Sequence, residues 1–181
     1  ATYVAWAASN FYTPIKQVSI IGNDFPQEEI TKLEKRGVQF EGVEVVPDGK
    51  SFFWSGRYHT DLNTRDTLVT DLNVLEQFNP QLPESYQDCE FLMLGNLAPA
   101  VQISVINQLK KRPKLIVMDT MNVWMSVAMD DLKKALTMVD VLMVNDSEAR
   151  ELSGEYSLVK AAAKIQTMGP KYLIIKKGEH G

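Results

Sequence analysis

The amino-acid sequence predicts an α/β fold in which an open, mostly parallel sheet is flanked by helices. Five short apolar runs have the length of a strand, and they occupy residues 18–24, 91–96, 115–120, 139–146 and 172–178. They are apolar on both faces, which is typical of strands buried in a parallel sheet. Three of the runs begin at residues 91, 115 and 139, so 24 residues separate successive starts and a crossover helix fits into each interval.

The segments between these runs carry the signals of helices. Residues 99–112 begin with Pro99, which suits a first helical turn, and end in a basic group that suits the helix dipole. Residues 157–169 stop at Gly169, directly before a proline, as helices commonly do. Residues 1–10 read as the interior of a helix. Strands that alternate with helices through right-handed crossovers form an open α/β sheet.

Residues 42–66 break this alternation. β-forming residues lie on both sides of the turn sequence Pro-Asp-Gly-Lys at residues 47–50, which predicts an inserted β-hairpin. Four aromatic side chains of this hairpin need an apolar surface to cover, and they are Phe52, Phe53, Trp54 and Tyr58. The hairpin is therefore a lid over a site, an interface patch or a surface decoration, and the sequence leaves these alternatives open.

Composition and charge are those of a soluble globular protein and exclude several classes. The 181 residues suffice for one domain with a sizeable core. A net charge of −4 and a pI near 5.2 argue against binding to nucleic acid or to acidic membranes. No apolar stretch approaches the ~20 residues that span a bilayer, and no signal peptide is visible. The single cysteine, Cys89, fits the reducing cytosol, so we expect a cytoplasmic protein.

The two ends of the sequence predict a segment of a longer chain. The sequence starts without Met, inside an expected helix, and stops just after an expected strand. A processed domain with both ends trimmed is the alternative.

Polar residues at the ends of the predicted strands are the candidates for a functional site. Ligands of open parallel sheets bind beyond the carboxyl ends of the strands. The polar residues there are Asn96, Asp119, Asn145 with Glu148, and Lys177 with Gly178. Asp119 could equally cap the following helix, and Asn96 is the weaker candidate.

Asn145 and Glu148 form the strongest pair, at the start of a helix. The open amide groups of a first helical turn suit an anion such as phosphate. A carboxylate beside phosphate would repel it unless a cation lay between, and Mg²⁺ is commonly held by one or two carboxylates together with phosphates. A glutamate at this position also agrees with the helix dipole, so a purely structural capping role stays open.

The stretch NDSEARELSG, residues 145–154, resembles the N-x-x-E motif of the PfkB (ribokinase-like) carbohydrate kinases. The resemblance extends along nearly the whole chain. Residues 1–10 are similar to the helix that follows the family's Gly-Gly motif, and residues 18–38 to its strand, G-x-D turn and helix. Residues 42–66 lie where these kinases carry a substrate lid, and residues 172–181 resemble the strand and glycine turn that approach the ATP phosphates.

This resemblance implies a three-layer, Rossmann-like kinase domain, of which residues 1–181 are a part. The β lid is inserted at residues 42–66, and the remainder of the domain lies beyond residue 181. The implied function is ATP-dependent phosphorylation of a hydroxyl group on a sugar or sugar-like substrate, with ATP and Mg²⁺ as cofactors. Lid strands in this family often pair between subunits, so a homodimer through the lid is also expected.

The resemblance also assigns site residues. The implied cofactor-binding residues are Asn145, Glu148, Lys176, Lys177 and Gly178. Glu148 is the expected Mg²⁺ ligand, directly or through water. The expected lid residues that contact the substrate are Phe53, Arg57 and Tyr58.

The sequence departs from the family pattern at three places. Tyr3 stands where the family often has an asparagine that contacts the substrate, and Lys176 stands where many members have a threonine. This lysine could meet phosphate as a point cation or be solvated. The D-T-x-G-A-G-D signature, which supplies the anion hole and the catalytic aspartate, does not occur in residues 1–181. We therefore expect no catalytic base within these residues and place the aspartate beyond Gly181.

Two other functions remain as alternatives. One is a non-catalytic nucleotide- or sugar-binding module of the same fold. The other is a nicotinamide-dependent dehydrogenase, but the turn GNDFPQ at residues 22–27 lacks the G-x-G-x-x-G pattern that such enzymes use to bind pyrophosphate.

Overall fold

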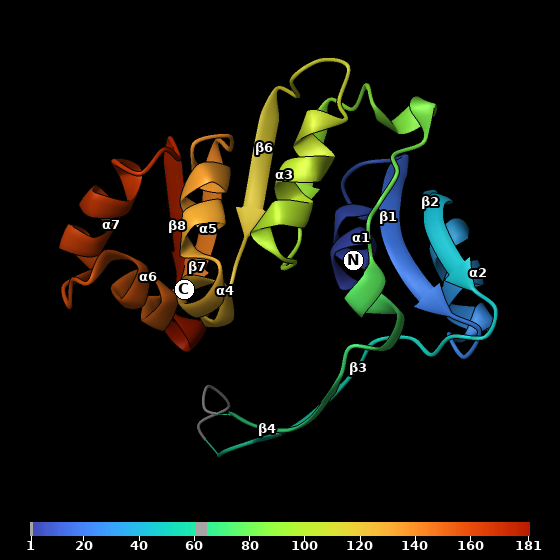
Figure 1. Cartoon of the computed structure of the whole chain (residues 1–181), viewed down its shortest axis with the longest axis horizontal. Coiled ribbons are helices and arrows are strands. Elements are labelled where there is room, and N and C mark those ends of the chain that lie inside the picture. Colours follow the sequence, from blue (N-terminus) through green and yellow to red (C-terminus); the bar gives the residue numbers. More distant parts are fainter. Residues whose placement is uncertain (1, 61–64) are drawn as a thin grey trace. The chain divides into compact units, whose positions relative to one another are not determined.

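The computed structural model describes residues 2–60 and 65–181. The chain folds into two compact units, Ala1–Tyr86 and Gln87–Gly181, and each is described by itself. Figure 1 shows the elements of both units, coloured along the chain from blue to red. In the described residues, no helix combines the length and the apolar character needed to cross a bilayer.

The first unit is built on a parallel pair of strands with a helix between them. Its first elements are α1 (Thr2–Ala8), β1 (Ile15–Gly22), α2 (Gln27–Glu34) and β2 (Val38–Val46), which confirm the predicted initial helix and first strand. β1 and β2 pair in parallel from Ile15 beside Val38 to Gly22 beside Val46. The small core of this unit contains Ala5, Leu33 and Val38, with Ile15 and Phe40 packed against it.

The inserted hairpin lies later in the chain than predicted. The assignment of residues 42–46 to it is wrong, because they belong to β2 and pair in parallel with β1. The hairpin consists of β3 (Phe53–Tyr58) and β4 (Arg65–Asp71), which pair antiparallel. The turn at residues 47–50 connects β2 to β3 instead of joining the two hairpin strands. Residues 61–64 of the predicted lid lie outside the described residues.

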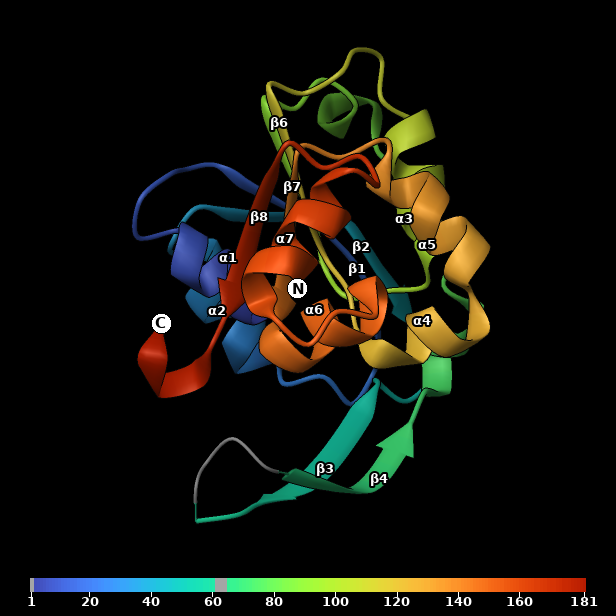
Figure 2. The ribbon, with the colours of Figure 1, turned by 90° about the vertical axis from the view of Figure 1, so that its left-hand side faces the viewer.

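The second unit contains a four-stranded parallel sheet in the order β5-β6-β7-β8. Its strands are β5 (Phe91–Leu94), β6 (Leu115–Asp119), β7 (Val141–Asn145) and β8 (Tyr172–Lys176), which confirms the predicted strands of this region. The helices of this unit are α3 (Pro99–Asn107), α4 (Asn122–Val127), α5 (Met129–Leu136), α6 (Asp146–Ser153) and α7 (Leu158–Gln166). Figure 2 turns the molecule so that α6 and α7 face the viewer. Short 3-10 helices complete the chain, namely η1 (Asn73–Gln77), η2 (Glu84–Tyr86) and η3 (Gly178–His180).

One face of the four-stranded sheet is closely packed, and the other is open at the outer strands. Leu94, Met118 and Leu142 are neighbours in register and are at most 5% exposed. Successive residues of a strand point to opposite faces. On the opposite face, Phe91 and Tyr172 of the outer strands are 53% and 52% exposed. The prediction of strands buried on both faces is therefore wrong for β5 and β8 within the described residues.

Two helices are followed by glycines with positive φ, and one of them is the predicted helix end at Gly169. Gly37, after α2, has a φ of +83°, and Gly169, after α7, has a φ of +141°. A Cβ atom at Gly169 would lie 2.5 Å from the carbonyl oxygen of Leu136. Both the dihedral angle and the space therefore favour glycine at this helix end.

Helix α3 begins with Pro99 as predicted but ends earlier than predicted, at Asn107. The basic residues 110–112 lie beyond its last turn, so the predicted interaction of these charges with the helix dipole is wrong. Arg112 pairs instead with Asp140, with 2.8 Å between Nη2 and Oδ1.

Candidate functional site

Three polar residues lie at the carboxyl ends of neighbouring strands of the second unit, on β6, β7 and β8. Asp119 ends β6, Asn145 ends β7 and Lys176 ends β8. Asn145 and Lys176 are neighbours in the β7–β8 register. The ammonium group of Lys176 reaches past β7 and lies 3.3 Å from Oδ1 of Asp119. This edge therefore presents a cation and a carboxylate side by side, both partly accessible, with exposed side-chain fractions of 47% and 29%.

Asn145 and Glu148 form a capping box at the start of α6. Oδ1 of Asn145 accepts a hydrogen bond from the backbone N–H of Glu148 at 2.8 Å, and Oε2 of Glu148 accepts one from the N–H of Asn145 at 2.7 Å. Glu148 is only 7% exposed. The hydroxyl of Ser147 also donates to Oδ1 of Asn145, at 2.7 Å. The capping role that the sequence left open is therefore present, and it holds the Glu148 carboxylate in one orientation.

The first residue of α6 is tied to its own helix. Oδ2 of Asp146 lies 2.5 Å from Nη1 of Arg150, one turn later. The hydrogen bond from Arg150 lowers the pKa of the Asp146 carboxyl below its ordinary value. Arg150 also donates to the carbonyl of Tyr156 at 3.0 Å and lies 5.3 Å from the centre of its ring. The Asp146 charge is thus partly compensated within α6, and Glu148 is the other carboxylate in the first turn of the helix.

A buried glutamine that the sequence analysis missed connects the ends of β5 and β6. Gln102 of α3 is 2% exposed, and its Nε2 donates to the carbonyl oxygens of Gly95 and Asp119, at 2.8 and 3.0 Å. The adjoining Thr120 is 3% exposed. Among the described residues, Oε1 of Gln102 and Oγ1 of Thr120 have no hydrogen-bond partner. The signal for Gln102 was present in the sequence, because it is a polar residue inside the otherwise apolar stretch PAVQISVI.

Side-chain hydrogen bonds also connect the loops that follow the strands. Oδ1 of Asn96, after β5, accepts from Nε1 of Trp124 on α4 at 2.8 Å. Asn122, at the start of α4, donates to the carboxylate of Glu151 on α6. The strand-end loops of β5, β6 and β7 are therefore held together around the edge that carries Asp119 and Asn145.

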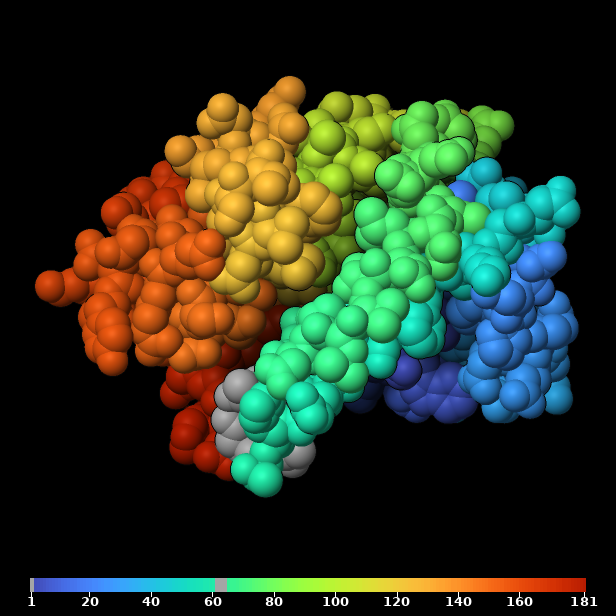
Figure 3. Space-filling view, turned by 60° about the horizontal axis from the view of Figure 1, so that its bottom comes forward, coloured from blue at the N-terminus to red at the C-terminus, as the bar shows by residue number. Residues whose placement is uncertain are grey.

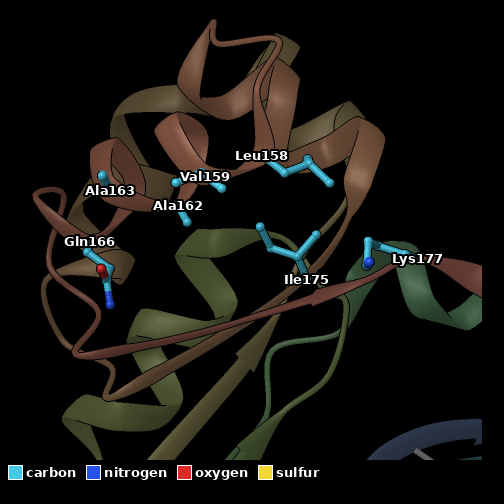
Figure 4. Close-up of a pocket in the computed structure, with 7 residues that line it drawn as sticks. All are labelled: Leu158, Val159, Ala162, Ala163, Gln166, Ile175 and Lys177. Carbon is cyan, nitrogen blue, oxygen red and sulfur yellow. The ribbon is translucent and has the colours of Figure 1, made fainter. Parts of the chain in front are cut away.

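Lys177 lies on a different side of β8 from Lys176. It lines a shallow, mostly apolar groove of about 440 Å³ between α7 and β8, together with Leu158, Val159, Ala162, Ala163, Gln166 and Ile175 (Figure 4). Gly178 follows with a φ of +60°, a conformation that favours glycine. The structure thus brings Asp119, Asn145 and Lys176 together and directs Lys177 toward α7.

The expected substrate residues lie on the hairpin of the first unit. Phe53, Arg57 and Tyr58 all belong to β3. Phe53 and Tyr58 are each 54% exposed, and Arg57 pairs with Asp66 on β4 at 3.7 Å. The hairpin, coloured teal to green in the space-filling view of Figure 3, carries apolar surface on both of its strands, since Leu68 of β4 is 58% exposed.

A family model described as pfkB family carbohydrate kinase matches residues 4–181. The chain belongs to the PfkB family. This confirms the resemblance seen in the N-x-x-E stretch at residues 145–148 and along the rest of the sequence.

The relatives of this PfkB chain include kinases. It is 27% identical over 183 residues to a cytidine kinase of Thermococcus kodakarensis, and the match covers 100% of this chain and 64% of that protein. A crystal structure of an E. coli protein provisionally named ribokinase II, in complex with ATP and Mg²⁺, has a TM-score of 0.75 at 19% identity, covering 99% of this chain and 61% of the other. A Burkholderia thailandensis nucleoside kinase in complex with inosine has a TM-score of 0.74 at 18% identity, covering 99% and 58%.

These likenesses confirm the predicted α/β fold as ribokinase-like. The PfkB chain spans less than two thirds of the length of each of these relatives.

The carboxylates of the PfkB chain fit a Mg²⁺ ion held mainly through water and phosphate. The described residues contain no cluster of three or more His, Cys, Asp or Glu side chains suited to a metal. One oxygen of Glu148 is engaged in the capping box, and Asp119 is paired with Lys176. Mg²⁺ usually keeps several waters and takes one or two carboxylates plus phosphates. Glu148 and Asp119 therefore suit a Mg²⁺ ion that keeps most of its water and phosphate ligands, and they do not by themselves enclose a metal ion.

Proposed function

We propose that the complete protein is an ATP-dependent kinase that phosphorylates a hydroxyl group of a sugar or of a nucleoside. The observation that carries this proposal is the edge where Asp119, Asn145 and Lys176 meet beside the capped start of α6, in a chain of the PfkB family. The relatives support it, because they include a cytidine kinase and a structure that holds ATP and Mg²⁺.

The start of α6 and Lys176 are the proposed phosphate contacts. Backbone N–H groups and the helix dipole favour an anion at this end of a helix. The side-chain nitrogen Nδ2 of Asn145 is not used in the capping box, which engages Oδ1 and the backbone N–H, so Nδ2 can donate to a phosphate oxygen. Lys176 supplies a positive charge from the neighbouring strand, and the loop that begins with Lys177 and Gly178 is proposed to approach the nucleotide.

Mg²⁺, when bound, would neutralise charge between the phosphates and the protein carboxylates. Glu148 is proposed to orient a water ligand of that ion, since its carboxylate is already fixed by the N–H of Asn145. Positioning and charge neutralisation carry most of the catalysis in phosphoryl transfer. We place the aspartate that accepts the hydroxyl proton outside residues 1–181, because the D-T-x-G-A-G-D motif is absent from them.

The β3–β4 hairpin is the proposed substrate lid. Its exposed side chains, among them Phe53, Arg57 and Tyr58, would cover the bound acceptor and exclude water that would otherwise hydrolyse ATP. The apolar side chains of Leu68 and Val69 on β4 are 58% and 40% exposed as well. Pairing of two lids in a homodimer would bury such surface, so we extend the proposal to a lid-mediated dimer.

A nucleoside is the first acceptor to test, since the cytidine kinase match covers the whole of this chain. In the full-length protein, MgATP and one acceptor among cytidine, inosine and ribose are expected to raise the melting temperature, because ligands that bind only the native state stabilise it. ADP release is expected only when both substrates are present.

Other results with these ligands would favour one of the two alternative functions. A raised melting temperature without ADP release would favour the non-catalytic binding module. A melting temperature raised by NAD and unchanged by MgATP would favour the dehydrogenase function and contradict the proposed kinase function.

A further inference from the structure

The two chain segments that lead into and out of the β3–β4 hairpin are hydrogen-bonded to each other. The carbonyl of Lys50, before β3, accepts from the N–H of Val74, after β4, at 3.2 Å. The carbonyl of Ser51 accepts from Nδ2 of Asn73 at 2.9 Å. These segments, residues 49–52 and 72–74, are called the lid roots below, and they close the base of the hairpin.

The incoming lid root is also bound to the end of β1. Oδ1 of Asp24 accepts from the N–H of Ser51 at 2.7 Å, and Oγ of Ser51 accepts from the N–H of Gly22 at 3.0 Å. The N–H of Asn23 donates to the carbonyl of Gly49 at 3.2 Å. A Cβ atom on Gly22 would lie 2.3 Å from that same carbonyl oxygen, so the root backbone lies directly against the strand end.

Two local features indicate that these contacts are specific. Asn73 adopts a φ of +50°, a conformation that non-glycine residues rarely take and that asparagine tolerates best. Hydrogen bonds from the backbone and hydroxyl of Ser51 lower the pKa of the Asp24 carboxyl, so the ionised form is the one that is bound.

Asp24 has no competing structural task in the helix that follows it. An aspartate shortly before a helix commonly caps it. Helix α2 has Pro26 at its N-cap position, however, and no side chain forms a cap hydrogen bond there. The carboxylate of Asp24 is therefore directed to the lid root.

We propose that Asp24, Ser51 and Asn73 form a clamp that fixes the base of the lid and confines its movement to the strands beyond the clamp. They are positioning residues and do not touch the reacting groups. β3 and β4 pair only with each other among the described residues, so the orientation of the hairpin depends on its base. The role of the clamp in holding the lid over the substrate rests on the proposed function, whereas the existence of the clamp does not.

The test uses the full-length protein with Asp24→Ala, which removes the acceptor, and Asp24→Asn, which keeps an acceptor without the charge. Asp48→Ala is the matched control, because this exposed aspartate lies in the neighbouring turn at residues 47–50. Hydrogen–deuterium exchange of the lid roots is the first measurement. Exchange of the Ser51 and Val74 amides is expected to become about tenfold faster in Asp24→Ala, less in Asp24→Asn, and unchanged in Asp48→Ala.

Kinetics with the acceptor identified for the wild-type protein form the second measurement. Asp24→Ala is expected to raise the acceptor KM about tenfold while kcat changes much less, since the lid must be held over the acceptor. Wild-type exchange at both lid roots in Asp24→Ala would overturn the clamp. Faster exchange with an unchanged KM would overturn its role in positioning the lid. A wild-type protein without kinase activity would contradict the proposed function, and exchange alone would then decide the clamp.

Discussion

Replacing Gln102 by glutamate is expected to lower the free energy of unfolding by roughly 3–5 kcal/mol, as happens when a charge is left buried without a partner. Gln102 is 2% exposed, and its Nε2 donates to the carbonyl oxygens of Gly95 and Asp119. A carboxylate would place a third oxygen acceptor against these two and would lose both donors. Urea unfolding of the full-length protein, followed by fluorescence, measures the difference.

The pH dependence of this variant has a defined sign. Burial raises the pKa of the introduced carboxyl in the folded state above its unfolded value of about 4.3. Below pH ~4 the introduced carboxyl is protonated in both the folded and the unfolded variant, and the variant keeps most of its stability. As the pH rises, the unfolded variant loses the proton more readily than the folded one, and the free energy of unfolding falls. The difference from wild type should thus be small at pH 4 and large at pH 7.

An exposed glutamine provides the control for the first prediction. Gln166→Glu makes the same chemical change at the exposed last residue of α7. It loses the long hydrogen bond from Nε2 to the carbonyl of Lys171 and sets a negative charge at the helix end, and should lower the stability by no more than ~1 kcal/mol. Equal stability of Gln102→Glu and Gln166→Glu at pH 7 would show that the Gln102 hydrogen bonds do not hold the ends of β5 and β6 together.

Glu148→Gln is expected to reduce turnover of the full-length protein about 10- to 100-fold, the usual effect of altering a group that orients a metal ligand. The amide oxygen of glutamine can still accept the hydrogen bond from the N–H of Asn145, because capping boxes use Glu and Gln alike. The substitution therefore removes the charge and keeps the cap. Turnover measured over a Mg²⁺ titration should show a higher Mg²⁺ requirement at a nearly unchanged melting temperature.

Two further variants separate the roles of Glu148. Glu148→Ala also removes the hydrogen bond that the Glu148 carboxylate accepts from the N–H of Asn145, and should cost about 1 kcal/mol of stability in addition to turnover, while Oδ1 of Asn145 still caps the helix. Glu155→Gln is the matched control for charge, since it lies just beyond the end of α6. If Glu148→Gln and Glu155→Gln turn over equally fast at every Mg²⁺ concentration, Glu148 has a role in the capping box alone and none in placing Mg²⁺.

Local patterns in the sequence were sufficient to predict the strands of the second unit, and they left a capping role for Asn145 and Glu148 open. The apolar runs that begin at residues 91, 115 and 139 are short, evenly spaced and bounded by polar residues, so strand length and crossover length agree. Asn145 and Glu148 stand at the spacing that reciprocal capping requires. These features depend on neighbours within a few residues, which a sequence displays directly.

Features that depend on distant partners were not predictable in the same way. The β-forming residues of β2 fit a hairpin and a parallel pair equally well, and only the long register with β1 decides between them. The contact between Lys176 and Asp119 joins residues 57 positions apart on strands separated by β7. Its existence follows from strand order, which the spacing of apolar runs does not reveal.

The closed base of the hairpin has a consequence for protein engineering. Lys50 is hydrogen-bonded to Val74, and Ser51 to Asn73. The β3–β4 hairpin therefore leaves the first unit and returns to it at nearly the same point. Hairpins of other lengths and shapes could be grafted between these positions without altering β1 or β2. Under the proposed function, such an exchange would change the lid over the acceptor and leave the proposed phosphate contacts at Asn145 and Lys176 unchanged.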